Sequence, residues 1–241
     1  GVKQMKIVKV NNKEELSEKA TELFVHALNR LEKPVIGLAT GSTPEGMYDK
    51  LTEKYQAGDI TFKNAITFNL DEYASLAADN PNSYRYYMDE KLFNHVDIQK
   101  ENTHLPNGLA DDLQKECKIF DDSITKEGDL DFLVLGIGLN GHIGFNEPGT
   151  SFDSRTHVVE LTESTREVNS CFFDSLDEVP TEALTMGLGT IMEAKEIMLL
   201  VQGDKKAEIL KKVLHGEITE EVPASILQRH PNTTIITDVT L

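Results

Sequence analysis

Short apolar runs alternate along the chain with longer stretches in which apolar residues recur every three or four positions. A short uninterrupted apolar run indicates a strand covered on both faces, and the longer spacing indicates a helix with one buried face. The pattern predicts strands at residues 5–10, 35–39, 65–69, 130–135, 196–201 and 233–237. It predicts helices at residues 13–31, 44–55, 83–93, 111–126, 181–193 and 205–215.

This alternation of strands and helices predicts an α/β fold. We expect an open, mostly parallel, doubly wound (Rossmann-like) sheet with helices on both faces, which is a three-layer αβα arrangement. No repeat or linker rich in Pro, Gly or Ser divides the chain, so residues 1–241 are expected to form a single domain. Residues 1–4 precede Met5, carry no secretory signal pattern and are expected to be a remnant of processing.

The chain is acidic, with 24 Lys and Arg residues against 41 Asp and Glu and a net charge of −17. This charge argues against nucleic acids and anionic membrane surfaces as partners, and no apolar run is long enough to span a membrane. The two cysteines, Cys117 and Cys171, are expected to be reduced in a cytoplasmic protein that has no zinc site. A phosphorylated ligand would therefore need a local positive potential.

A polar motif follows each of four predicted strands, at the sheet end where ligands of open α/β proteins bind. The first motif comprises Thr40, Gly41, Ser42 and Thr43. Gly41 permits close approach of the backbone, and Thr43 followed by Pro44 predicts the capped start of a helix. A helix N-terminus attracts anions, so the motif is either a phosphate site or an ordinary capped turn.

The second motif begins with Asp71 and Glu72, directly after the strand expected at residues 65–69. Adjacent side chains point in opposite directions in regular structure, so one carboxylate is expected to face the site and the other the solvent. A carboxylate held near a substrate carbon can remove a proton next to a carbonyl group. The alternative is a solvated acidic loop.

The third motif covers residues 136–149 and begins with the spacing G-x-G-x-x-G. A dinucleotide site needs a helix directly after these glycines, whereas further Gly and Pro residues here predict a long irregular loop. We therefore reject the cofactor interpretation. His142, with Glu147 available to orient its ring, is a candidate acid or base, and the alternative is a structural histidine.

The fourth motif follows the strand expected at residues 196–201 and contains Asp204, Lys205 and Lys206. Asp204 is expected to cap the next helix, which places both lysines in the first helical turn. Cations there oppose the helix dipole, and a bound anion would remove the conflict. The lysines are therefore either phosphate ligands or ordinary surface charges.

Taken together, these motifs resemble those of the glucosamine-6-phosphate deaminase family, in its short bacterial type. The segments that carry the resemblance are residues 37–46, 68–73 and 135–149. Shorter supporting segments are residues 81–84, 106–108, 154–157, 183–187 and 203–207. The similarity extends over nearly the whole chain and preserves the order of the motifs.

The resemblance implies conversion of glucosamine 6-phosphate and water to fructose 6-phosphate and ammonium, without a metal or an organic cofactor. It implies that His142 opens the sugar ring with support from Asn140 and Glu147, and that Asp71 then moves the proton from C2 to C1. Family members often carry Asp at position 140. Because the neutral amide of Asn does not stabilise the positive charge of a protonated imidazole, we expect a less basic His142.

The resemblance also places the substrate phosphate on the backbone of residues 40–43 and on Lys206. Family members usually carry an arginine that contacts the substrate at the position of Cys171. Its absence puts substrate affinity in question. Arg166, one helical turn and a residue earlier, is a candidate substitute.

Larger family members bind an N-acetylated sugar phosphate allosterically, through a longer C-terminal tail and basic residues near positions 157 and 159. Here those positions hold His157 and Val159, and the sequence ends at Leu241. We therefore expect no activation by N-acetylglucosamine 6-phosphate, and a monomer or small homo-oligomer.

Three alternatives to the deaminase remain open. A 6-phosphogluconolactonase would hydrolyse an ester of a sugar phosphate and would not need Asp71 as a carbon base. An isomerase would rearrange a hexose phosphate without losing an amine. A non-enzymatic sugar-phosphate sensor, like the effector domains of some repressors, is disfavoured because the chain has no basic helix-turn-helix segment.

Overall fold

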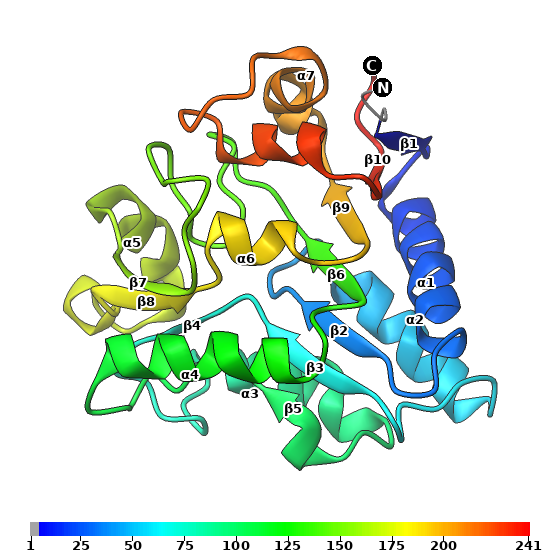
Figure 1. Cartoon of the computed structure of the whole chain (residues 1–241), viewed down its shortest axis with the longest axis horizontal. Coiled ribbons are helices and arrows are strands. Elements are labelled where there is room, and N and C mark those ends of the chain that lie inside the picture. The colour runs from blue at the N-terminus through cyan, green and yellow to red at the C-terminus, as the bar shows by residue number, and fades with distance from the viewer. Residues whose placement is uncertain (1–4) are drawn as a thin grey trace.

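The computed structural model describes residues 5–241, and the expectation for residues 1–4 lies outside this range. A seven-stranded parallel sheet with the order β1-β10-β9-β6-β2-β3-β5 runs through the molecule (Figure 1). Its strands are β1 (Lys6–Lys9), β2 (Val35–Leu38), β3 (Ile66–Asn69), β5 (Thr103–His104), β6 (Phe132–Leu135), β9 (Ile197–Val201) and β10 (Thr233–Thr237). The six strands expected from the apolar runs are thus confirmed.

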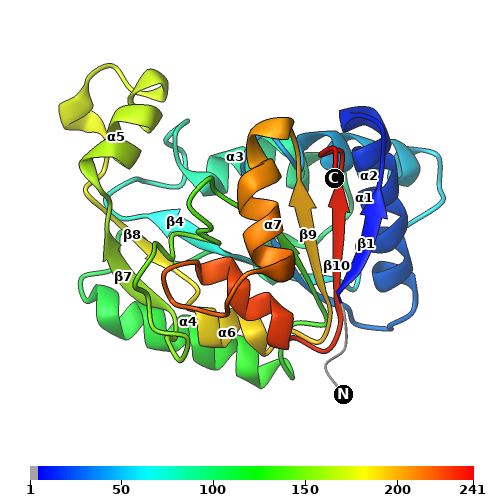
Figure 2. The same ribbon diagram turned by 90° about the horizontal axis from the view of Figure 1, so that it is seen from above.

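Helices cover both faces of this sheet, which confirms the predicted three-layer α/β architecture. The α-helices of the described residues are α1 (Lys13–Asn29), α2 (Glu45–Gln56), α3 (Tyr84–Lys91), α4 (Leu113–Lys126), α5 (Glu163–Asn169), α6 (Leu188–Met192) and α7 (Ala207–His215). Short 3-10 turns are η1 (Phe93–His95), η2 (Lys100–Asn102), η3 (Ser170–Phe172), η4 (Leu176–Glu178), η5 (Asp204–Lys206) and η6 (Pro223–Arg229). Helices α1, α2 and α3 lie on one side, and α4 and α6 lie on the other (Figures 1 and 2).

The central strands form the core because every residue of β2, β6, β9 and β10 is buried. The order of strands reverses between β2 and β6: the chain proceeds from β2 to β3 and β5 on one side, and from β6 to β9 and β10 on the other. Ligands of open α/β sheets bind at the carboxyl ends of strands beside such a reversal. The fold therefore predicts a ligand site at the loops that follow β2 and β6.

A second, antiparallel sheet has the order β4-β8-β7, with β4 (Asp71–Tyr73), β8 (Glu182–Thr185) and β7 (His157–Glu160). It corrects the prediction of one helix at residues 181–193, of which only α6 is helical. The β8 segment pairs with strands on both sides, and this pairing outweighs its local helical pattern. Gly187 separates β8 from α6, and a Cβ atom there would lie 2.2 Å from the backbone oxygen of Ser154.

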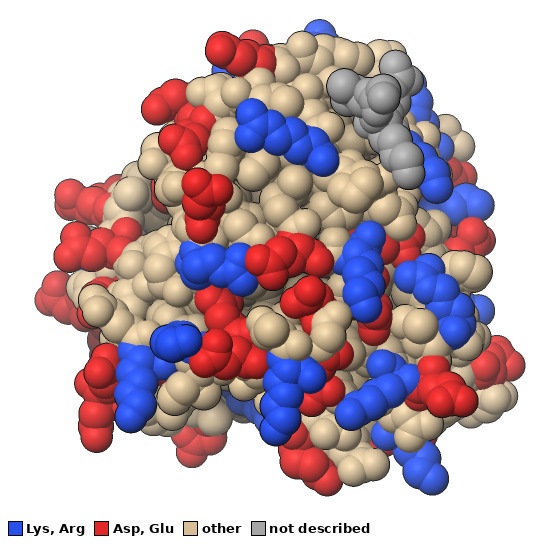
Figure 3. All heavy atoms as spheres, in the orientation of Figure 1, with Lys and Arg blue, Asp and Glu red and all other residues tan. Residues whose placement is uncertain are grey.

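The surface charge is dispersed over the face seen in Figure 1. Figure 3 shows acidic and basic side chains interspersed there, so the excess of carboxylates is not collected into one patch on this face. Cys117 is buried and Cys171 is exposed, and both are free thiols, as expected. No helix within residues 5–241 is both long and apolar enough to cross a membrane.

Candidate active site

Four consecutive strands of the large sheet carry the four polar motifs at their carboxyl ends. In spatial order these strands are β9, β6, β2 and β3. All are parallel, so the loops that follow them emerge at the same edge of the sheet. The separate motifs of the sequence are therefore neighbours in space, and they lie on both sides of the reversal between β2 and β6.

The loop after β2 offers free backbone N–H groups. Gly41 has a φ of 103°, a left-handed conformation that favours glycine. The hydroxyl of Tyr48 donates to the carbonyl of Ala39, and the hydroxyl of Tyr87 donates to the carbonyl of Gly41. Within the described residues, the N–H groups of residues 41–43 donate to no acceptor. The carbonyl groups of the loop are thus held by tyrosines while three donors are left for a ligand.

The predicted cap of α2 is wrong in detail. The cap residue is Pro44 rather than Thr43, and no side chain caps the helix. The N–H of Glu45 instead reaches the carbonyl of Ser42 at 3.4 Å. Because no side chain serves the first turn, its positive end remains directed at the loop.

Lys206 extends from its place after β9 to the loop after the neighbouring strand β6. It belongs to η5 rather than to the first turn of α7, and Asp204 accepts from the N–H of Thr240 instead of capping the helix. The ammonium group of Lys206 donates to the carbonyl of Ile137, directly after β6. Burial lowers the pKa of Lys206, whereas Lys205 is exposed. Lys206 is thus the lysine of this pair that faces the site.

The loop at residues 136–149 is irregular, as predicted, and contains no helix. Gly138 is required because a Cβ atom there would lie 2.0 Å from Cε1 of His142. The imidazole Nδ1 is 2.7 Å from Oδ1 of Asn140, and Nδ2 of Asn140 is 2.7 Å from Oε2 of Glu147. Glu147 therefore orients His142 through Asn140, since its own Oε1 is 3.9 Å from Nδ1.

This chain of hydrogen bonds defines the tautomer of His142. The carboxylate of Glu147 can only accept, so Asn140 directs its NH₂ group toward Glu147 and its oxygen toward the ring. Nδ1 then carries the proton and Nε2 is free to accept one. Burial, followed by the nearby Lys206, lowers the pKa of His142, while Glu147 opposes the shift. A neutral imidazole with a free Nε2 suits a proton-transfer role.

Asp71 lies on β4 rather than in a loop, with 8% of its surface exposed. Burial, and secondly the charge of Glu72, raise the pKa of Asp71 to about 8. A Cβ atom at Gly144 would lie 2.8 Å from Oγ1 of Thr185 and 3.9 Å from Oδ2 of Asp71. The loop that carries His142 therefore passes directly beside the Asp71 carboxylate.

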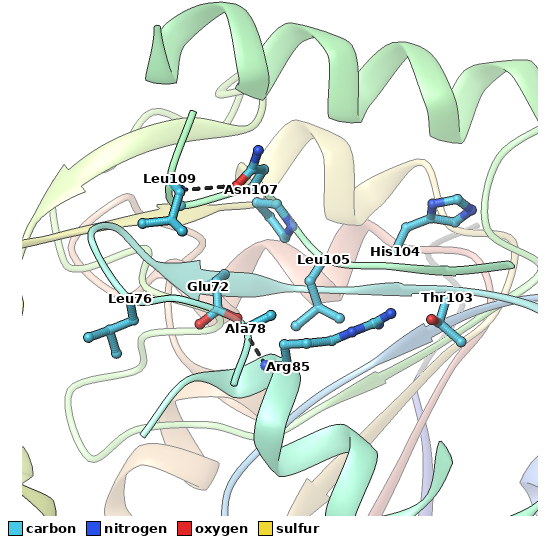
Figure 4. A pocket seen from close by; sticks show the side chains of 11 residues that line it. Glu72, Leu76, Ala78, Arg85, Thr103, His104, Leu105, Asn107 and Leu109 are labelled. Atoms are coloured by element: carbon cyan, nitrogen blue, oxygen red, sulfur yellow. Dashed lines mark hydrogen bonds between the residues drawn. The ribbon is translucent and has the colours of Figure 1, made fainter. Parts of the chain in front are cut away.

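Glu72 does not face the solvent, contrary to the prediction. Only 4% of its surface is exposed, and its carboxylate accepts from backbone N–H groups. A cavity of about 300 Å³ adjoins it, lined also by Arg85 and residues 103–109 (Figure 4). This cavity contains none of the other motif residues, so it lies beside the candidate site and is not the site itself.

Arg166 stabilises the conformation of the segment that follows α5. Its guanidinium group donates through Nη2 to the carbonyls of Leu176 and Val179. Cys171 lies in η3 with its thiol exposed and directed at the carbonyl of Val168. These contacts give Arg166 a structural role, and its role toward phosphate stays a prediction.

Sequence patterns missed three residues that build the site. Tyr48 and Tyr87 hold the loop after β2, and Thr185 accepts from the N–H of Phe145 beside Asp71. Thr185 lies directly opposite Asp71 in the β4–β8 pairing. No sequence pattern indicates these contacts, because Tyr87 and Thr185 bond residues 46 and 40 positions away, and the bond of Tyr48 to Ala39 forms only once α2 packs beside β2.

Comparisons with known proteins agree with this geometry. Residues 11–236 match the family model described as glucosamine-6-phosphate isomerases/6-phosphogluconolactonase. A glucosamine-6-phosphate deaminase of Oceanobacillus iheyensis is 56% identical, covering 97% of this chain and 94% of the relative. One of Thermoanaerobacter pseudethanolicus is 52% identical, covering 97% and 92%.

Solved structures show the same fold. A monomeric glucosamine-6-phosphate deaminase superposes with a TM-score of 0.94 at 48% identity, covering 97% of each chain. A 6-phosphogluconolactonase of Trypanosoma cruzi superposes with a TM-score of 0.75 at 20% identity, covering 97% of this chain and 94% of its own. At that identity the second likeness concerns the fold alone.

Proposed function

The chain belongs to the family of glucosamine-6-phosphate isomerases and 6-phosphogluconolactonases, and we propose that it acts as a deaminase within that family. The proposed reaction converts glucosamine 6-phosphate and water to fructose 6-phosphate and ammonium. The observation that carries this proposal is a buried carboxylate, Asp71, beside a loop that presents an oriented His142, at the sheet edge that also carries the free N–H groups of residues 41–43. Ester hydrolysis would not need a carbon base at Asp71.

The phosphate group binds first in this proposal. The N–H groups of residues 41–43 and the positive end of α2 supply a fixed potential, and Lys206 supplies a charge. Thr40 joins this loop to β2. A dispersed net charge of −17 makes these local donors the main source of attraction for a sugar phosphate.

His142 then opens the pyranose ring. Its free Nε2 takes the proton of the O1 hydroxyl and returns it to O5 as the C1–O5 bond breaks. The product is the open-chain aldehyde. Asn140 and Glu147 hold the imidazole in the tautomer that this transfer requires, and Glu147 stabilises the transient positive charge.

Asp71 next removes the proton from C2, giving an enolamine, and returns a proton to C1. This leaves an iminium group at C2, which water attacks, and the resulting carbinolamine expels ammonia to give the ketone. The raised pKa of Asp71, about 8, makes its carboxylate a stronger base than an exposed aspartate once it is ionised.

Ammonium release from glucosamine 6-phosphate tests the proposal. We expect stoichiometric formation of ammonium and fructose 6-phosphate, at a rate unchanged by N-acetylglucosamine 6-phosphate. Hydrolysis of 6-phosphogluconolactone is measured in parallel. Hydrolysis without ammonium release would replace the deaminase by a lactonase, and ligand binding with neither reaction would favour a sensor.

Replacing Lys206 by alanine is expected to raise KM by about 10-fold with a smaller change in kcat. The reason is that Lys206 would make a charge-assisted contact with the phosphate in both the ground and transition states. Steady-state kinetics measures the effect, and Lys205→Ala is the matched control because Lys205 is exposed. An unchanged KM in Lys206→Ala would remove this residue from the phosphate site.

A further inference from the structure

Glu72 is a buried carboxylate with an unusual set of partners. Its Oε1 accepts from the N–H groups of Tyr73 and Tyr84, and its Oε2 accepts from the N–H of Arg85, each at 2.9 Å. Figure 4 shows Glu72 directed at the start of α3, where one of these bonds is drawn. The carboxylate therefore ties the strand β4 to the first turn of a helix.

These partners favour the ionised form of Glu72. Tyr84 and Arg85 are the first residues of α3, whose N–H groups have no partner within the helix. The helix end and the Arg85 guanidinium both attract negative charge. Burial raises the pKa of Glu72 above its ordinary value, and the three N–H bonds and Arg85 reduce the size of that rise.

The neighbouring carboxylate has the opposite environment. Among the described residues, no hydrogen-bond donor reaches the side chain of Asp71. The charged group that most affects it is Glu72, and the hydroxyl-bearing rings of Tyr73 and Tyr84 are close enough to sense its charge. Two adjacent buried carboxylates in such different surroundings have different roles: Glu72 is suited to stay charged, and Asp71 is suited to carry a proton.

We propose that Glu72 is the positioning residue for Asp71: its buried carboxylate fixes the short strand β4 and keeps a negative charge beside Asp71, which makes Asp71 a stronger base. The proposal rests on the proposed function only for the use of that base. A substitution of Glu72 that removes its charge but keeps its shape should make Asp71 a weaker base. A substitution that keeps the charge but alters the packing of the side chain should not.

The variant Glu72→Gln removes the charge and keeps an acceptor for two of the three N–H groups. We expect the pKa of Asp71, followed by carbon NMR of labelled carboxyl groups, to fall by about one unit. Glu72→Asp keeps the charge and should leave the titration of Asp71 nearer to that of the wild type. Asp71→Asn assigns the resonance. A titration of Asp71 unchanged in Glu72→Gln would overturn the proposal.

A matched control is available nearby. Oε1 of Glu116 accepts from the N–H of Asn107, in the loop where Gly108 packs on the backbone oxygen of Tyr73. Glu116→Gln makes the same chemical change in a contact that also supports β4, and the charge of Glu116 is not among the causes of the raised pKa of Asp71. If the pKa of Asp71 shifts as much in Glu116→Gln as in Glu72→Gln, the effect is structural and the electrostatic role of Glu72 is overturned.

Activity supplies an independent readout. In Glu72→Gln the acidic limb of the kcat/KM profile should move to lower pH with the pKa of Asp71, whereas damaged packing would lower the plateau without moving that limb. If Glu72→Gln does not fold, the wild-type titration decides: Glu72 must ionise at a lower pH than Asp71, and the reverse order refutes the proposal. Because the NMR titrations need no substrate, they hold even if no ammonium is released.

Discussion

Replacing Asp71 by asparagine is expected to abolish turnover and, at the same time, to stabilise the protein at neutral pH. Turnover is lost because the amide cannot take the C2 proton. We expect ammonium release to fall by at least about 10³-fold and exchange of the C2 proton with solvent to disappear. Measurable exchange at the wild-type rate in Asp71→Asn would remove Asp71 from its proposed role.

The gain in stability follows from the raised pKa of Asp71. Its pKa is about 8 in the folded protein against an ordinary 3.8, so the folded state holds the proton more tightly than the unfolded state. Wild-type stability is therefore lost progressively as the pH rises from about 4 to about 8. The amide avoids this loss, so the advantage of Asp71→Asn is absent near pH 4 and complete above pH 8.

The size of the gain can be estimated and measured. Each pKa unit corresponds to about 1.4 kcal/mol, which suggests a rise in the free energy of unfolding on the order of 2–4 kcal/mol at pH 7. Urea denaturation of the wild type and Asp71→Asn at pH 5, 7 and 9 measures it. A difference that does not grow with pH would show that burial of the Asp71 charge carries no cost.

Asp121→Asn is the matched control for stability. The carboxylate of Asp121 accepts from the N–H of Thr156 at 3.0 Å and from its hydroxyl at 2.6 Å. Its replacement should lower stability by about 1–2 kcal/mol, because the amide keeps only one of the two oxygens and one donor of Thr156 loses its acceptor. Opposite signs for the same chemical change would separate a carboxylate placed for chemistry from one placed for structure.

The large sheet and the location of the site were predictable from local signals. The apolar runs of β2, β6 and β9 are buried on both faces, and each is followed directly by polar and glycine residues. Parallel strands bring such loops to one edge, whatever their separation in the chain. The need for glycine at position 41 was also predictable, because the backbone turns sharply there, whereas the contact that requires Gly138 is with His142 and follows from the folded loop.

What sequence reasoning missed depends on contacts between distant segments. Strand β4 has three residues and was not predicted, since its pairing with β8 joins residues more than a hundred positions apart. The alternation of adjacent side chains predicts that one of Asp71 and Glu72 faces the solvent, whereas both are buried because the start of α3 supplies N–H groups that stabilise the Glu72 carboxylate. The family resemblance implies Asn140 as a support, but its position between His142 and Glu147 follows only from the folded loop.

Replacing His142 by glutamine is expected to lower kcat/KM by about 10²–10⁴-fold while KM changes little. Glutamine can keep a hydrogen bond to Asn140 but cannot carry a proton between O1 and O5. Because ring opening precedes the chemistry at C2, exchange of the C2 proton should fall by the same factor as ammonium release. Steady-state rates and exchange measured in deuterated buffer test this equality.

The control for His142 is Asn140→Asp, which keeps the ring acceptor and adds a negative charge. The carboxylate should raise the pKa of His142, which burial and Lys206 lower in the wild type, by about one unit. Proton NMR of the imidazole would show this shift, with turnover retained within about 10-fold. A His142→Gln enzyme with near wild-type turnover would mean that the ring opens without His142. The chain from Glu147 through Asn140 would then orient a structural histidine, and Asp71 would be the sole acid–base group that the site requires.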